Sequence, residues 1–384
     1  MNLRRTDNRY DLHQTTWFSW ITDRITLKTV SIAATFSGIA LLTGVAVGRS
    51  NSTQKNNVDE SKKYVGIYNE GATCYMNTLI QTLFHLPEFK RRIFASRSSS
   101  GIIYAFQKLF YNMQFNNGAT ASTANLMDAF GWGNTDANIQ QDIQELTRLL
   151  LEVLENVNPQ LTALFEGQTR SYIECTKVDF KSSRIEMFHD LQLDVSRSKN
   201  VLQSFVNYTS PELLYGPNQY NTDDQRYGRQ DALKGVRFVT LPPVLMLHLE
   251  RYTFNPYTQA RTKINTPYDV ELKINLSRFV EDSDNNDVYC LHSVLVHKGN
   301  VNSGHYYNYV RTSLGVSDAD VWHKFNDDTV SEVGEYEVLS SKAYMLCYVR
   351  ESEIPNVMCK FQKSEISPQL VERIERDSGM CVIL

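Results

Sequence analysis

The amino-acid sequence predicts an α+β domain that follows an N-terminal transmembrane helix. Two observations predict the domain: amphipathic runs with helical spacing fill its first part, and short β-branched or aromatic runs separated by turn residues fill its later part. Helices followed by strands are typical of α+β architectures. A third observation predicts the membrane helix, because twenty residues without a charge lie between Lys28 and Arg49.

The composition is that of a globular protein. Of 384 residues, 42% are apolar and 11% aromatic, enough to bury one large core or two ordinary ones. The 39 basic and 43 acidic side chains are mixed along the chain, and this argues against a nucleic-acid partner. The six cysteines include no CxxC pair, so we expect reduced thiols rather than a disulfide framework or a structural zinc site.

The first 63 residues divide into three segments. Residues 1–28 are polar, and residues 29–48 are long enough to cross a bilayer as a helix. A cleaved signal peptide and a buried soluble helix are the alternatives for residues 29–48, but the polar lead is long for a signal peptide. Residues 49–63 have no apolar period and are predicted to be a linker. Basic residues flank both sides of the segment 29–48, so its orientation has to come from the chemistry of the domain.

The folded domain is predicted to extend from residue 64 to residue 352. Apolar residues recur at helical spacing in three early runs, which cover residues 75–86, 102–113 and 139–157. Strands are expected in six later runs, which cover residues 183–195, 236–252, 289–299, 304–312, 321–327 and 343–351.

Residues 353–384 are predicted to form a C-terminal helical tail. The chain finishes on Cys-Val-Ile-Leu, which fits a C-a-a-X prenylation box at Cys381 with a terminal Leu that favours geranylgeranyl. A plain hydrophobic tail is the alternative. No polybasic stretch stands just upstream, so one prenyl chain would anchor the protein weakly and residues 29–48 would be the second signal.

Cys74 is the candidate nucleophile, because it lies where a Gly/Ala/Thr turn meets a helical run and the positive end of a helix favours a thiolate. His305 heads an aromatic strand and is the candidate base, with Asn326, Asp327 or Asp328 as its orienting partner. The amide of Asn69 could donate to an oxyanion together with the backbone N–H of the nucleophile. A lone cysteine or histidine more often has a structural role, but the order and spacing of these residues favour a thiol hydrolase.

Longer stretches of the chain resemble the ubiquitin-specific proteases. The run GIYNEGATCYMNTLIQTLF resembles the cysteine box of that family, and SGHYYNYV with WHKFNDD resembles its histidine box. The resemblance extends over roughly residues 62 to 375 and is greatest to the herpesvirus-associated branch. It implies a papain-like thumb and palm with a fingers subdomain. It also implies hydrolysis of the isopeptide or peptide bond after the C-terminal glycine of ubiquitin, with ubiquitin and ubiquitinated proteins as partners and no cofactor.

The resemblance also implies a role for each matched residue. Cys74 would be the nucleophile, His305 the general base and then acid, and Asn326 the residue that orients the imidazole. Asn69 would be the oxyanion donor. Asp327 would support the imidazole, and the sequence leaves open whether it or Asn326 dominates.

Four further residues match positions that bind the ubiquitin tail in the family. Asp142 and Glu145 lie three apart, hence on one helical face, and the match implies that they receive the arginines of the tail. A solvated acidic face is the alternative. Tyr252 and Tyr306 match positions that line the channel for the terminal glycines, and ordinary aromatic core is the alternative.

The chain departs from the family pattern in its cysteines, which bear on zinc binding, and in its apparent membrane segment, which bears on its location. Many members carry two CxxC pairs in the fingers, whereas Cys175 is the single thiol in the corresponding stretches here, so we expect no zinc. The apparent membrane segment predicts a membrane-anchored enzyme with its catalytic domain facing the cytosol, on the mitochondrial outer membrane or the endoplasmic reticulum. The alternatives to a deubiquitinase are a catalytically inactive ubiquitin-binding scaffold and a protease for a ubiquitin-like modifier.

Overall fold

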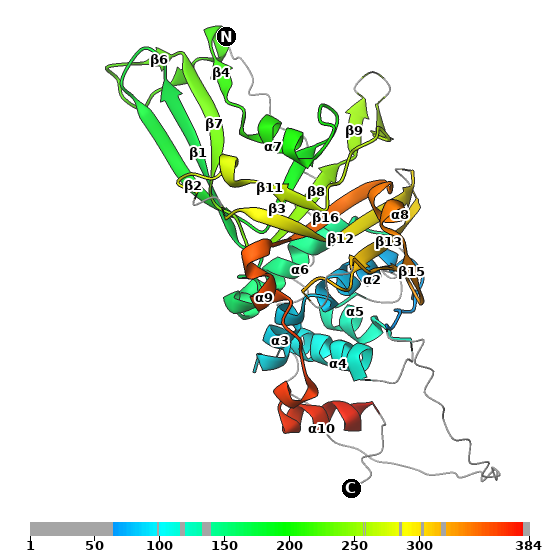
Figure 1. Cartoon of the computed structure of the whole chain (residues 1–384). Coiled ribbons are helices and arrows are strands. Elements are labelled where there is room, and N and C mark those ends of the chain that lie inside the picture. Colours follow the sequence, from blue (N-terminus) through cyan, green and yellow to red (C-terminus); the bar gives the residue numbers. More distant parts are fainter. Residues whose placement is uncertain are drawn as a thin grey trace, which may run out of the picture.

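The computed structural model describes residues 64–378 except 98–99, 116–119, 133–139, 256, 258, 284–285, 301–302 and 316–319. The described part mixes helices and strands, as the sequence predicts. Helices dominate the first part of the domain (Figure 1). They are α2 (Cys74–Phe84), α3 (Pro87–Ala95), α4 (Gly101–Phe115), α5 (Ala124–Phe130) and α6 (Ile143–Val157).

A large sheet packs against these helices. Its strands are β3 (Asp190–Asp194), β8 (Val244–Glu250), β11 (Lys273–Asn275), β12 (Val288–Gly299), β13 (Gly304–Arg311), β14 (Trp322–Asn326), β15 (Thr329–Val333) and β16 (Ala343–Arg350). Their spatial order is β15-β14-β13-β12-β16-β8-β3, with β11 paired to β12. Only the β3–β8 pair among them is parallel. The antiparallel order brings the late strands β13 and β14 next to each other at one side of the sheet.

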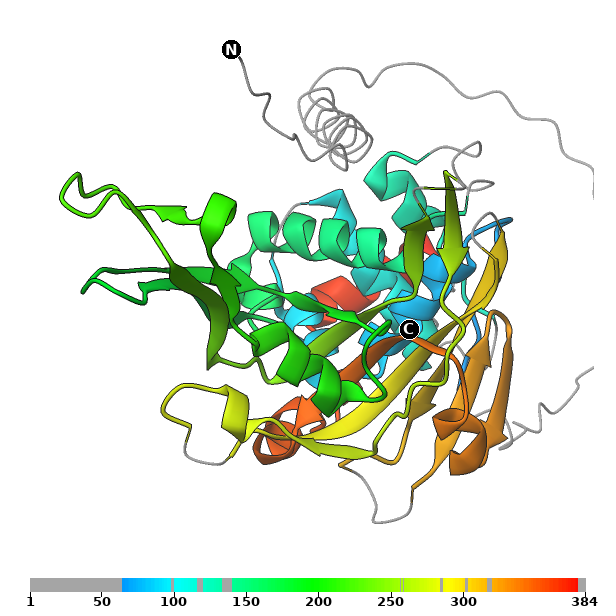
Figure 2. The same cartoon turned by 90° about the horizontal axis from the view of Figure 1, so that it is seen from above.

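A second sheet projects away from the helices (Figures 1 and 2). It has the order β2-β1-β7-β4, with strands β1 (Gly167–Cys175), β2 (Lys181–Phe188), β4 (Glu212–Leu214) and β7 (Ala232–Thr240). The small ribbon of β5 (Tyr220–Asn221) with β6 (Arg229–Gln230) lies at the outer end of this sheet (Figure 1). A second ribbon, β9 (Tyr252–Asn255) with β10 (Ala260–Lys263), lies apart from it, beyond the end of β8. The helices, the central sheet and the projecting sheet agree with the thumb, palm and fingers implied by the resemblance.

The remaining helical segments are short. They comprise α7 (Val201–Thr209), α8 (Glu335–Leu339), α9 (Ile354–Val357) and α10 (Pro368–Asp377), with 3-10 turns at Pro159–Leu161, Gly216–Asn218, Ser277–Phe279, Glu351–Glu353 and Lys363–Glu365. The last helix returns to the early ones, because Tyr104 on α4 donates a 2.6 Å hydrogen bond to Asp377. The predicted helical tail therefore packs on the domain.

The central sheet separates two hydrophobic cores. Along β8, Val244 and Met246 pack with the early helices, whereas Leu245 and Leu247 pack on the other face with residues of α7. The same alternation runs along β16 from Met345 to Val349, because successive side chains of a strand point to opposite faces. Burial on both faces explains why these strands read as nearly continuous apolar runs.

Two predicted runs divide in the structure. The run 236–252 is broken by Pro242 and Pro243, which lack a backbone N–H for a ladder, so it forms β7, β8 and the start of β9. Of the run 139–157, residues 140–157 are described, and their helix begins only at Ile143. The side chain of Asp142 accepts from the Gln144 N–H at 2.8 Å and caps the helix there.

The prediction of a membrane-anchored enzyme is corrected by the structure. Within the described ranges, no helix is both long and apolar enough to cross a bilayer. The segment 29–48, predicted to be a transmembrane helix, lies outside the described residues, as do residues 1–28 and 49–63. The placement on a mitochondrial or endoplasmic-reticulum membrane therefore has no support. Cys381 also lies outside the described residues, and its prenylation stays a prediction.

Candidate active site

Cys74 is the first residue of α2 and is buried, with 2% of its surface exposed. All of α2 is buried between the other helices and the central sheet, so the helix axis and its first residue are held in place. Asn308 on β13 strengthens this contact, because its amide donates to Thr78 O at 3.2 Å and to Thr82 Oγ1 at 2.9 Å. The helix that carries the thiol is thus bonded to the strand that carries His305.

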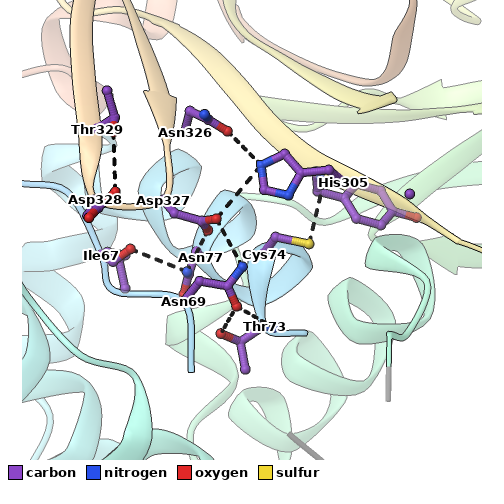
Figure 3. A network of polar contacts seen from close by, with 12 residues as sticks. Ile67, Asn69, Thr73, Cys74, Asn77, His305, Asn326, Asp327, Asp328 and Thr329 are labelled. Atoms are coloured by element: carbon purple, nitrogen blue, oxygen red, sulfur yellow. Dashed lines mark hydrogen bonds and ion pairs between the residues drawn. The ribbon is translucent and has the colours of Figure 1, made fainter. Parts of the chain in front are cut away.

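His305 is the second residue of β13, and its ring lies between Cys74 and Asn326 (Figure 3). Nε2 lies 2.6 Å from Oδ1 of Asn326, while Nδ1 faces the sulfur of Cys74. A hydrogen bond with Cys74, followed by the one with Asn326, raises the pKa of His305 to about 9 against the effect of partial burial. The imidazolium is therefore favoured at neutral pH, as in a thiolate–imidazolium pair.

Asp327 follows β14 and joins several parts of the site. Its Oδ2 accepts from Asn69 Nδ2 at 3.0 Å and its Oδ1 accepts from Asn77 Nδ2 at 2.8 Å (Figure 3). The same carboxylate lies 3.7 Å from His305 Nε2, farther than the amide of Asn326. Its backbone has a positive φ of 51°, which the turn between β14 and β15 requires. Asp327 therefore links the imidazole to the turn before α2, through Asn69, and to α2 itself, through Asn77.

Asn69 explains the shape of the turn before the thiol. Its Oδ1 accepts from the backbone N–H groups of Gly71 at 3.2 Å and Thr73 at 3.0 Å, and its Nδ2 donates to Asp327. The spacing of five residues to Cys74 is therefore that of a turn closed by the asparagine side chain. One hydrogen of the Nδ2 amide remains for a further acceptor.

Gly66 allows the segment before α2 to approach the turn after β14. A Cβ at this position would lie 2.4 Å from the carbonyl oxygen of Asp328. Ile67 donates its N–H to Asp327 O at 2.9 Å next to this contact. The two halves of the site meet backbone to backbone, which any side chain at position 66 would prevent.

Asp142 and the two predicted tyrosines meet beside this site. The hydroxyl of Tyr344 donates to Asp142, and the ring of Tyr344 lies 5.9 Å from that of Tyr252 and 5.8 Å from that of Tyr306, centroid to centroid. Burial and then the charge of Asp142 raise the pKa of Tyr252 to about 12. Tyr306 is 3% exposed and its backbone N–H lies 3.5 Å from Cys74 Sγ, which connects this cluster to the thiol.

Asp142 and Glu145 both lie at the start of α6, but only Glu145 lies within the helix. Asp142 is the N-cap of α6, whereas Glu145 lies in its first turn. Both carboxylates therefore stand at the positive end of the same helix, where the dipole favours negative charge.

Three residues near the site were missed by the sequence analysis. Asn77 was read only as part of a helical run, and Tyr344 only as part of a strand. His297 on β12 lies 4.5 Å from Tyr306 between ring centroids, and burial followed by the charge of Lys263 lowers its pKa to about 4. The asparagine at helical spacing from Cys74 was an available signal for Asn77, whereas nothing local distinguished the other two.

One group of possible metal ligands occurs among the described residues. Glu155, Glu166 and His189 place a carboxylate or imidazole atom within 4.8 Å of one another. They lie at the end of α6, directly before β1 and between β2 and β3. Cys175 at the end of β1 has no second thiol beside it in the projecting sheet. The expectation of no zinc in the fingers stays a prediction.

Fold and site together define the class of protein. A thiol at the start of a buried helix, facing an imidazole on a neighbouring strand that an amide orients, is the arrangement of a papain-like cysteine hydrolase. The model of the family described as "Ubiquitin carboxyl-terminal hydrolase" matches residues 65–348. The chain belongs to this family, which confirms the resemblance drawn from the cysteine and histidine boxes.

Individual relatives agree with this assignment. The chain is 38% identical to Ubiquitin C-terminal hydrolase 12 of Arabidopsis thaliana over 83% of this chain and 32% of the relative. It is 38% identical to Ubiquitin carboxyl-terminal hydrolase 7 of Drosophila melanogaster, over 82% of this chain and 30% of the relative. It is 35% identical to Ubiquitin carboxyl-terminal hydrolase 15 of Saccharomyces cerevisiae, over 83% of this chain and 30% of the relative. The chain thus spans about a third of the length of these relatives.

Proposed function

We propose that this chain is a deubiquitinating cysteine protease that hydrolyses the isopeptide or peptide bond after the C-terminal glycine of ubiquitin. Family membership supports the substrate class. The observation that carries the activity is the placement of the His305 ring between the thiol of Cys74 and the amide of Asn326 (Figure 3), because a scaffold that only binds ubiquitin needs no aligned thiol and imidazole.

In the proposed reaction, the Cys74 thiolate attacks the carbonyl carbon of the terminal glycine. The oxyanion receives the backbone N–H of Cys74 and the free hydrogen of the Asn69 amide. His305 then gives its Nδ1 proton to the leaving amine, and a thioester with Cys74 remains. His305 next takes a proton from water, which attacks the thioester and releases the carboxylate.

Asn326 and Asp327 have different proposed roles in this reaction. Asn326 is neutral and accepts directly from His305 Nε2, so it holds the ring in one orientation. The Asp327 carboxylate lies farther away and adds a charge that favours the imidazolium. We propose that Asn326 is the dominant orienting residue because its contact is shorter by about an ångström.

We further propose that Asp142 and Glu145 bind the arginines of the ubiquitin tail, while Tyr252 and Tyr306 line the path of its terminal glycines. Supporting this, the backbone of Tyr306 contacts the thiol of Cys74 and its ring contacts that of Tyr344, whose hydroxyl donates to Asp142. Carboxylate–guanidinium pairs are directional and charge-assisted, so they would fix the register of the tail.

The test uses the full chain and ubiquitin that carries a C-terminal electrophile. We expect the wild type and Cys359→Ala to form an adduct and Cys74→Ala to form none. Adduct formation that survives in Cys74→Ala would contradict the assignment of the nucleophile. Absence of any adduct from a folded wild type that binds ubiquitin would favour the scaffold, and an adduct only with the same probe built on another modifier would change the substrate class.

A further inference from the structure

Gln140 lies two residues before the N-cap of α6 and contacts both halves of the site. Its Oε1 accepts from the backbone N–H of Gly304 at 3.0 Å, and its Nε2 donates to the backbone carbonyl of Gly304 at 2.8 Å. The same Nε2 lies within hydrogen-bonding distance of Cys74 Sγ, at 3.6 Å. One amide group therefore pairs with the residue before His305 and also contacts the thiol.

Gly304 is held from a second side by His297. A Cβ on Gly304 would lie 2.2 Å from Nε2 of His297, so the imidazole packs directly on the glycine Cα. His297 is itself held at Nδ1 by the hydroxyl of Tyr252 and the ammonium of Lys263, each at 2.8 Å. The first residue of β13 is thus fixed between an amide and an imidazole, and His305 is the next residue.

The chemistry of the contact suits a primary amide. The two hydrogens of Nε2 match its two acceptors, Gly304 O and Cys74 Sγ, and Oε1 matches the one backbone donor. The sulfur receives a second N–H from the backbone of Tyr306 at 3.5 Å. Donors oriented toward the sulfur favour its anionic form, because hydrogen bonds to an ion are stronger than those to a neutral group.

We propose that Gln140 is a positioning residue for the Cys74–His305 pair. It fixes the start of β13 through Gly304 and donates to Cys74 Sγ, and thereby stabilises the thiolate. This inference rests on the proposed function only in taking that thiolate as the nucleophile. A merely structural role would lower the unfolding temperature of a Gln140 variant without changing how thiol reactivity depends on pH.

The test measures the rate at which iodoacetamide alkylates Cys74 in the full chain between pH 5 and pH 9, with peptide mass spectrometry to separate the cysteines. Gln140→Glu removes both N–H donors and adds a negative charge beside the sulfur. We expect its alkylation profile to shift to higher pH by about one unit, so that its rate at a pH well below the midpoint falls about tenfold. Gln140→Ala loses the donors without the added charge and is expected to shift less in the same direction.

Gln141→Glu is the matched control, because it makes the same charge change one residue away and its side chain makes no hydrogen bond among the described residues. We expect its profile to coincide with the wild type. Alkylation of Cys359, which contacts Arg91 at 2.9 Å, is an internal reference in every variant. Unchanged Cys74 profiles in both Gln140 variants, or an equal shift in Gln141→Glu, would overturn the proposal.

A second set of variants and a reaction that needs no ubiquitin make the alkylation test independent of folding failures and of the proposed function. If Gln140→Glu does not fold, Gln140→Ala and Gln140→Asn carry the test, and the asparagine keeps an amide that is one methylene too short to reach both partners. Alkylation by iodoacetamide requires no ubiquitin. A shifted profile in an enzyme that does not cleave ubiquitin would therefore refute the proposed function while upholding the role of Gln140. An unchanged profile in an enzyme that does cleave ubiquitin would refute the role of Gln140 while upholding the proposed function.

Discussion

Asn69 donates a 3.0 Å hydrogen bond to Asp327, and this bond joins the turn before the thiol to the turn after β14 across 258 positions of the sequence. Asn77 on α2 donates to the other oxygen of the same carboxylate. Both amides therefore depend on one anion that also lies near His305. Asp327 thus affects the relative placement of thiol and imidazole as well as the charge beside the imidazole.

Substitutions at Asn326 and Asp327 should separate two effects: the orientation of the His305 ring and the joining of the turn before α2 to the turn after β14. Asn326→Ala removes the direct acceptor of His305, and we expect kcat to fall about 10- to 100-fold with little change in the free energy of unfolding. Asp327→Asn turns one N–H group toward the donors of Asn69 and Asn77, so we expect the free energy of unfolding to fall by about 1–3 kcal/mol together with kcat. Steady-state hydrolysis and urea unfolding measure the two quantities.

Asp328→Asn is the control for this pair, because Asp328 is exposed and accepts only from Thr329 among the described residues, at 3.2 Å. It should change neither quantity. Equal loss of stability in Asp327→Asn and Asp328→Asn would refute the role of Asp327 in joining the two turns.

The titration of His305 should depend on Cys74. Its pKa is raised to about 9 from an ordinary value of 6.5, so the imidazolium contributes stability that is complete below about pH 6.5 and is lost as the pH rises through 9. Because Cys74 is the first cause of the increase, Cys74→Ala should lower the titration midpoint toward the ordinary value. Imidazole NMR of histidine-labelled protein measures it, with Cys359→Ala as control. The same midpoint in Cys74→Ala and wild type would exclude the thiol as the cause.

His248 should make the domain sensitive to acid. Burial lowers its pKa to about 4, and neither ring nitrogen has a hydrogen-bond partner among the described residues. The unfolded chain takes up this proton near pH 6.5 and the folded chain only near pH 4. Stability is therefore lost as the pH falls between these values, by about 1.4 kcal/mol per pH unit for one proton.

In His248→Phe, the dependence of the free energy of unfolding on pH should be less steep by the contribution of one proton. Phenylalanine is chosen because it keeps a ring against Tyr344, whose centroid lies 5.0 Å from that of His248. Urea unfolding at pH 7, 6 and 5 gives the slope for both proteins. Parallel slopes would show that His248 does not take part in the acid response.

Asp142 permits a test of tail binding that spares the helix. Asparagine caps helices as well as aspartate does, so Asp142→Asn keeps the acceptor for Gln144 while it removes the charge. We expect KM for a ubiquitin substrate to rise about tenfold, with a smaller change in kcat. The variant should recover part of this loss when the tail arginines of ubiquitin are replaced by glutamine. A KM that is unchanged by Asp142→Asn would contradict the proposed arginine site.

Much of the fold could be predicted because its signals are local. The helix at 74–84 and the strands at 288–299, 304–311 and 343–350 follow apolar runs whose length and residue types, with turn residues between them, indicate helix or strand. β1 was missed because its residues are mostly half-buried in the projecting sheet, which has little core and so imposes little apolar alternation. The start of α6 was misplaced because an aspartate inside a helical run can also be a cap.

The candidate site shows the same division. Four local facts could be predicted: a thiol at a helix start, a histidine at the head of a strand, an Asn-Asp pair at a strand end, and the family whose boxes they match. The folded chain alone shows that Asp327 binds Asn69 and Asn77, that Asp142 accepts from Tyr344, and that Gln140 pairs with Gly304. These contacts join residues 164 to 258 positions apart, and such pairs depend on sheet order and strand register, which local periodicity does not specify.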